Sequence, residues 1–167
     1  MDIVVNDTNI FIDLYSIDLL DDFFALPFNF HTIDFVLAEI TDQNQLDALK
    51  PFLEEGKLFV KKHSEKELQQ IVELQSLCNG NVSITDCAVC QYALLNDYFL
   101  LTGDRQLRSS AISSGVSVHG IIFIFNKLID YNIITKNVAA DKLESLSQLN
   151  KRLPKREIEE LIRCWRK

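Results

Sequence analysis

The chain has 167 residues and a net charge of −7, with 47% hydrophobic and 25% charged residues. This length fits one domain with a substantial core, and the composition is that of an ordinary globular protein. No apolar stretch approaches the roughly 20 residues that a membrane span needs, and the first residues lack the basic start of a signal peptide. The sequence therefore predicts a cytoplasmic protein that does not enter a membrane.

The charges are unevenly distributed along the chain. Residues 1–60 carry 12 acids and 2 bases, whereas residues 99–167 carry 7 acids and 12 bases. The acidic segment is a poor surface for nucleic acid, while the basic segment is able to follow a phosphate backbone. Solvated helix faces explain the same basic residues equally well, so both interpretations stay open.

Cysteine usage points to thiols rather than to disulfides. The four cysteines, Cys78, Cys87, Cys90 and Cys164, are too few and too irregularly spaced for the framework of a secreted protein. Cys87 and Cys90 have the C-x-x-C spacing of some zinc and redox sites. They have no partner pair and fall within a helical pattern, which favours buried thiols.

Apolar runs alternate with helical patterns along the chain. Short runs rich in β-branched and aromatic residues predict strands at residues 3–6, 28–32, 58–60, 98–102 and 116–118. Apolar residues at helical spacing predict helices at residues 9–23, 34–49 (one helix or two, ended by Pro51), 64–77, 85–96 and 105–114. Three further helices are predicted at residues 121–131, 137–150 and 154–166.

This alternation predicts an α/β fold with three layers, α/β/α, around a parallel sheet of roughly five strands. We expect one domain over residues 1–167, with a core over about 1–120 and a helical C-terminal extension over about 121–167. In open sheets of this kind, ligands bind beyond the carboxyl ends of the strands, where the strand order reverses. Side chains that follow the strands are therefore the first candidates for a functional site.

Four acidic residues lie where apolar runs turn into the next element. Asp7 and Asp104 follow the first and fourth expected strands, Asp86 opens the helix before strand four, and Glu39 lies on a helix that can reach the same edge. Two carboxylates about 4 Å apart repel each other by about 4 kcal/mol at an effective dielectric near 20. A fold that gathers several of them is typical of proteins that bind a divalent cation.

Each of these residues also has a simpler interpretation. Asp7 is a favoured residue for the N-cap of the helix that follows it, and Asp86 has the chemistry of a helix start. Asp104 follows a glycine and fits a turn, while Glu39 fits the solvated face of an amphipathic helix. A capping role and a metal-binding role can coexist at Asp86.

The four residues together resemble a known family. Asp7-Thr8-Asn9 after the first strand, a helical Glu39, Asp86 before strand four, and Thr102-Gly103-Asp104-Arg105 after it look like the PIN domain. This fold occurs in VapC-type toxins of toxin–antitoxin pairs and in many RNA-processing nucleases. The resemblance covers roughly residues 1–120, and the segment after Gly120 is similar to the extension of a bacterial PIN subgroup.

The resemblance implies a Mg²⁺- or Mn²⁺-dependent endoribonuclease. Asp7, Glu39, Asp86 and Asp104 match the metal-binding and catalytic carboxylates, and Asn9 and Thr102 match polar positions that support them. Arg105 and Arg108 flank the expected site and are candidates for contact with substrate phosphates. The implied partners are an RNA substrate, a small antitoxin whose Arg or Lys would fill the acidic site, and a second copy in a homodimer. The extension is a candidate to cover the site, form the dimer contact or hold the partner.

Other functions remain to be separated from this one. A DNA-directed or structure-specific nuclease would use the same residues, and a PIN fold that serves as a protein-binding module would have weak or no catalysis. A nucleotide-binding domain of another family is disfavoured, because no Gly-x-Gly-x-x-Gly follows the first strand and no Gly-Lys-Ser/Thr occurs.

Overall fold

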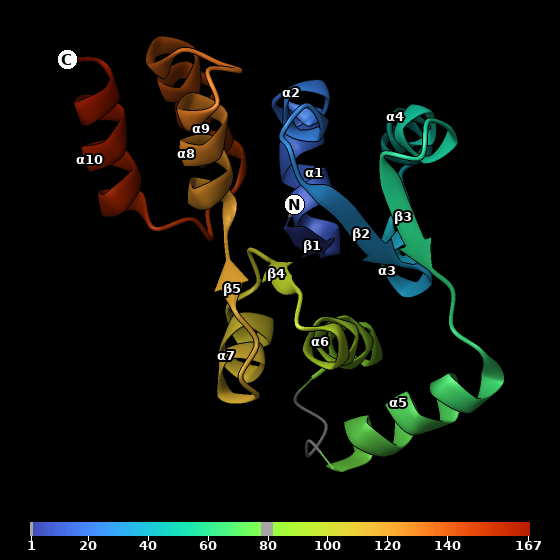
Figure 1. Cartoon of the computed structure of the whole chain (residues 1–167). Coiled ribbons are helices and arrows are strands. Elements are labelled where there is room, and N and C mark those ends of the chain that lie inside the picture. Colours follow the sequence, from blue (N-terminus) through green and yellow to red (C-terminus); the bar gives the residue numbers. More distant parts are fainter. Residues whose placement is uncertain (1, 78–81) are drawn as a thin grey trace.

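The computed structural model describes residues 2–77 and 82–167, and it contains a parallel sheet of five strands (Figure 1). The strand order is β3-β2-β1-β4-β5, and every neighbouring pair is parallel. The strands are β1 Ile3–Asn6, β2 Asn29–Ile33, β3 Leu58–Lys61, β4 Phe99–Leu101 and β5 Val118–His119. The sequence-based prediction of a parallel α/β fold is thereby confirmed.

Helices cover both faces of this sheet. They are α1 Thr8–Ser16, α2 Leu20–Phe24, α3 Asp34–Glu39, α4 Gln43–Glu54, α5 Glu65–Leu77, α6 Ile84–Asn96, α7 Arg105–Ser113, α8 Ile121–Asp130, α9 Lys136–Leu149 and α10 Lys155–Trp165. In Figure 1, α1, α2, α4, α8 and α9 lie on one side of the sheet, and α6 and α7 lie on the other. None of the helices in the described part of the chain is long and apolar enough to cross a membrane.

Strand β1 lies in the middle of the sheet, where the order of the strands reverses. The chain moves from β1 to β2 and β3 on one side and then returns to place β4 and β5 on the other. Asn6 is paired with Leu101, and the Asp7 N–H donates to the Leu101 carbonyl oxygen at 3.1 Å. The residues that follow β1 and β4 are therefore held side by side at the switch point of the sheet.

Two helix predictions were wrong in detail. The segment 9–23 forms two helices, α1 and α2, because Asp18 adopts a left-handed conformation with φ 51° between them. Pro51 does not end α4, which continues to Glu54. Proline removes one helical hydrogen bond, but the last turn is held by Phe52, whose buried ring stacks on Phe24 at 4.0 Å between centroids. Tertiary packing therefore overrides the local signal.

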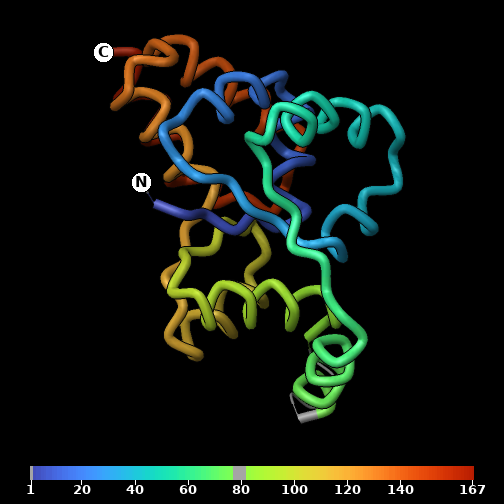
Figure 2. The backbone as a smooth tube through the Cα atoms, turned by 45° about the vertical axis from the view of Figure 1, so that its right-hand side comes forward, coloured from blue at the N-terminus to red at the C-terminus, as the bar shows by residue number. Residues whose placement is uncertain are grey.

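The C-terminal extension packs on the core instead of forming a separate body. Helix α8 buries Phe125 and Leu128, and Trp165 at the end of α10 packs near Phe125 with ring centroids 6.1 Å apart. Lys142 on α9 donates from Nζ to the carbonyl oxygens of Ile17 and Asp18, at 2.6 and 3.0 Å. Figure 2 shows the result, with the orange and red C-terminal segments beside the blue N-terminal helices.

Candidate active site

Asp7 is buried at the carboxyl end of β1 and is the N-cap of α1. Its Oδ1 accepts a hydrogen bond from the Thr8 N–H at 2.7 Å. Its Oδ2 accepts one from Asn9 Nδ2 at 2.6 Å and one from the Thr102 hydroxyl at 2.7 Å. Only 4% of the residue is exposed. The carboxylate is thus fixed in one orientation by three donors, and its capping role coexists with its place in the site.

Asn9 and Thr102 join the loops that follow β1 and β4. The Thr102 hydroxyl donates to Asp7 and also accepts from the Asp104 N–H at 3.0 Å. Asn9 Oδ1 accepts from the Gly103 N–H at 2.7 Å. A Cβ atom at Gly103 would lie 3.1 Å from Asn9 Oδ1, so a larger residue would crowd this contact. These bonds hold the two ends of the central strands in one rigid unit.

The other three predicted carboxylates come from three further elements. Glu39 ends α3 and accepts from the Thr8 hydroxyl at 2.9 Å. Asp86 shares a capping box with Ser83 at the start of α6. Asp104 is the N-cap of α7, and its Oδ1 accepts from the N–H groups of Gln106 and Leu107, both at 2.8 Å.

One pocket of about 250 Å³ is lined by all four of these acidic residues, and we call it the carboxylate pocket. Within residues 2–77 and 82–167, no three His, Cys, Asp or Glu side chains lie close enough together to hold a metal ion. Glu39 accepts from Thr8 of α1, whereas Asp86 and Asp104 accept from N–H groups at the starts of α6 and α7, and like charges repel one another at short range. The structure thus brings the four residues to one pocket but not into one coordination shell.

Burial and mutual repulsion change the proton affinity of the carboxylates. Burial raises the pKa of Asp7 to about 6, against the opposing hydrogen bonds from Thr102 and Thr8, and the charges of Asp86 and Glu39 raise it further. Burial is also the main reason that the pKa of Asp86 is raised, with Asp104 and Glu39 contributing repulsion. Such shifts mark the sites where a cation would relieve an unfavourable charge.

Replacing Thr102 with Val is expected to destabilise the protein by about 2 kcal/mol. The hydroxyl is buried, and its loss leaves both an acceptor on Asp7 and the Asp104 N–H without this partner. Urea unfolding at pH 7 measures the change. Thr102→Ser keeps the hydroxyl and serves as the control. Val keeps the Thr102 methyl group and Ser keeps the hydroxyl, so a loss in Thr102→Ser as large as in Thr102→Val would contradict the assignment of the effect to the hydroxyl alone.

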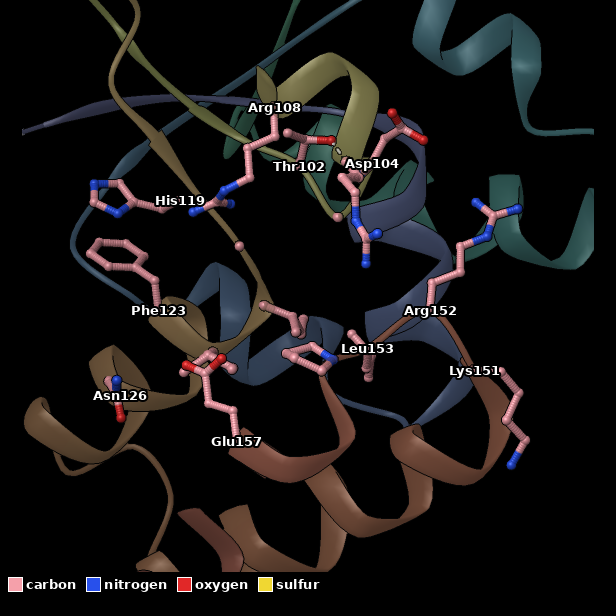
Figure 3. Close-up of a pocket in the computed structure, with 16 residues that line it drawn as sticks. Thr102, Asp104, Arg108, His119, Phe123, Asn126, Lys151, Arg152, Leu153 and Glu157 are labelled. Atoms are coloured by element: carbon pink, nitrogen blue, oxygen red, sulfur yellow. Dashed lines mark hydrogen bonds between the residues drawn. The ribbon is translucent and has the colours of Figure 1, made fainter. Parts of the chain in front are cut away.

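Arg105 and Arg108 do not line the carboxylate pocket. They line a larger cavity of about 1090 Å³ next to it, which also includes Asp104 (Figure 3). We call it the basic cavity, because its lining includes four cations, Arg105, Arg108, Lys151 and Arg152. Lys151 and Arg152 belong to the C-terminal extension, in which the sequence analysis named no individual functional residue.

Some contributors to the site were missed by sequence reasoning. Thr8 holds Glu39, and Gln106 lines the carboxylate pocket. The middle position of the Asp-Thr-Asn motif was the available signal for Thr8, whereas nothing local marks Gln106. Cys87 is buried and Cys90 is half-buried on α6, and Cys78 lies outside the described residues.

Comparison with known proteins places the chain in a family. The sequence model of a family described as a PIN domain matches residues 3–167, nearly the whole chain. A search of curated proteins gives no match. The matched range includes the C-terminal extension, in line with its packing on the core. The chain therefore belongs to the PIN domain family, whose members are generally nucleases.

Proposed function

We propose that this protein is a divalent-metal-dependent endoribonuclease that cleaves RNA phosphodiester bonds at the carboxylate pocket. The observation that carries the proposal is the convergence of Asp7, Glu39, Asp86 and Asp104 on one pocket at the switch point of a PIN-family sheet. Four different elements supply these residues. A protein that served only as a scaffold would gain nothing from this costly gathering of like charges.

The donor set fits a hard divalent cation. Mg²⁺ and Mn²⁺ prefer oxygen ligands, and Mg²⁺ keeps several waters and needs only one or two direct carboxylates. Asp7, Glu39, Asp86 and Asp104 would hold the ion, which supplies charge to neutralise the phosphoryl oxygens and makes water more acidic. Asn9 and Thr102 keep the Asp7 carboxylate oriented toward the pocket, so the chain itself contributes a preorganised anionic site.

A panel of substrates and metals tests the proposal. Structured RNA, single-stranded RNA and DNA of matched sequence are incubated with Mg²⁺, Mn²⁺ or EDTA, and the products are separated on a gel. We expect RNA cleavage with either metal, none with EDTA, and a higher melting temperature in Mn²⁺. Preferential cleavage of DNA would replace the ribonuclease with a DNA-directed enzyme. Neither cleavage nor stabilisation by metal would favour the protein-binding module.

We also propose that a small inhibitory protein controls this activity, as in a toxin–antitoxin pair. The support is the resemblance to VapC-type toxins together with the charge of the carboxylate pocket, which an Arg or Lys of the inhibitor would neutralise. The proposal about partners also includes a homodimer, in which two copies of the chain associate.

A further inference from the structure

The basic cavity lies between the core and the C-terminal extension. The core contributes the segment from Thr102 to Arg105, Arg108 on α7, and His119 with Gly120. The extension contributes Ile121 to Phe123 and Asn126 on α8, together with Lys151 to Pro154 and Glu157. Figure 3 shows Arg108 and Glu157 on opposite walls, with Asp104 near the upper rim. Asp104 also lines the carboxylate pocket, so the two hollows are neighbours that share this residue.

The charge of this cavity is mostly unpaired. Four cations line it against two carboxylates, Asp104 and Glu157. Among the described residues, none of the four cations forms an ion pair within 4.0 Å of a carboxylate. Unpaired cations that surround a concave surface attract a polyanion. The volume of about 1090 Å³ slightly exceeds the range of about 300–1,000 Å³ for ligand pockets, so the cavity has room for more than one phosphate group.

An aromatic wall closes one end of the cavity. The rings of His119 and Phe123 are stacked with centroids 4.1 Å apart. Burial and the nearby charges of Arg108 and Lys127 lower the pKa of His119, which favours the neutral form of its ring. Cationic side chains combined with aromatic rings are typical of sites for single-stranded nucleic acid. An acidic peptide would use the cations but would have less need of the rings.

The loop that carries Arg152 is tied to the helix that begins at the active site. Asn150 Nδ2 donates to both carboxylate oxygens of Asp13 on α1, each at 3.0 Å, and Asp13 is only 7% exposed. Asn150 Oδ1 accepts from the Arg152 N–H at 3.0 Å. The same helix α1 begins after Asp7 and contains Asn9. This tether fixes the position of the Arg152 backbone relative to the carboxylate pocket.

We propose that the extension forms the outer wall of the substrate channel, with Arg152 as a positioning residue for single-stranded RNA. Arg105, Arg108 and Arg152 hold the phosphates of the segment that leads into the carboxylate pocket, and the His119–Phe123 wall contacts a base. This inference rests on the proposed ribonuclease function and adds a role for the extension. Four of the 12 basic residues in 99–167 would thereby have a role, because they line the cavity through which the RNA passes.

The test is binding of a labelled 12-nucleotide single-stranded RNA in EDTA, followed by fluorescence anisotropy at several salt concentrations. Arg152→Ala is expected to raise Kd by roughly 5–10-fold and to reduce the slope of log Kd against log salt by about 1. Arg152→Lys should keep the slope. Arg163→Ala is the matched control, because Arg163 is an exposed arginine of the same extension that does not line the cavity.

A second variant separates position from charge. Asn150→Ala leaves every charge in place but removes the tether, and it should raise Kd while leaving the salt slope unchanged. Equal binding by the Arg152→Ala and Arg163→Ala proteins would overturn the inference and leave an acidic segment of a protein partner as the occupant. Because the assay contains no metal, it does not depend on cleavage. Wild-type cleavage with unaltered binding by Arg152→Ala would defeat this inference alone, whereas a binding defect without any cleavage would defeat the nuclease proposal alone.

Discussion

Replacing Asp7 with Asn is expected to lower metal-dependent RNA cleavage by about 10³-fold. Asp7 is the most buried of the four carboxylates and the one fixed by three hydrogen bonds. Loss of one carboxylate–cation interaction of about 4 kcal/mol, the value for unit charges 4 Å apart at an effective dielectric near 20, corresponds to this factor. Initial cleavage rates at saturating Mg²⁺ or Mn²⁺ measure it.

The fold of this variant should survive. An amide at position 7 can still accept from the Thr8 N–H, but its NH₂ group faces Asn9 Nδ2, another donor. Asp42→Asn is the control, because Asp42 is an exposed N-cap away from the pocket and Asn caps equally well. Growth arrest on induced expression, if the chain is a toxin, should likewise disappear with Asp7→Asn and persist with Asp42→Asn. Full activity of the Asp7 variant would remove the carboxylate pocket as the active site.

The metal-free protein is expected to lose about 2 kcal/mol of stability through Asp7 as the pH rises from 4 to 7. The pKa of Asp7 is about 6 in the folded protein, whereas the ordinary value of 3.8 applies to the unfolded chain. Between these values the folded state binds more protons than the unfolded state, so the free energy of unfolding falls with rising pH. Each unit of difference in pKa corresponds to about 1.4 kcal/mol. Urea unfolding in EDTA across this range measures the change.

The comparison with Asp7→Asn isolates this contribution from other groups that titrate. Asp13 and Asp86 have raised pKa values and act in the same direction, whereas Asp34, paired with His63, has a lowered pKa and acts in the opposite one. At pH 4 the variant should be less stable than the wild type by about 1 kcal/mol, because it has lost a hydrogen bond. At pH 7 the order should reverse, and Mn²⁺ should restore the wild type. Parallel stability curves would contradict the assignment to Asp7.

The strands were predictable because each is a short run of residues suited to a buried sheet. Pairing could also be inferred, since parallel strands joined by helices present their carboxyl ends at one edge, which brings Asp7 and Asp104 together. The division between α1 and α2 was not predictable from spacing, because apolar residues continue through the break at Asp18. The end of α4 was not predictable either, because the contact between Phe52 and Phe24 outweighs the tendency of Pro51 to end the helix.

The carboxylates of the candidate site were predictable from the sequence, but the long-range hydrogen bonds around them were not. Carboxylates after strands can be read from the chain, and their convergence on one pocket follows from topology. The hydrogen bonds between Asn150 and Asp13 join residues 137 positions apart, and neither residue belongs to a local pattern that points to the other. The basic cavity was missed for the same reason, because Arg108 and Arg152 become neighbours of one hollow only after the extension folds back.

The central position of β1 also sets the order in which the site can be assembled on the ribosome. Asp7 and its partner Thr102 are 95 residues apart in the chain, so at about 5–20 residues per second they are synthesised roughly 5–20 s apart. During that interval the β1 edge that later receives β4 is unpaired, and neither Thr102 nor Asp104 exists to complete the pocket. Under the proposed function, a nascent chain therefore has no catalytic activity until β4 has been synthesised and has paired with β1.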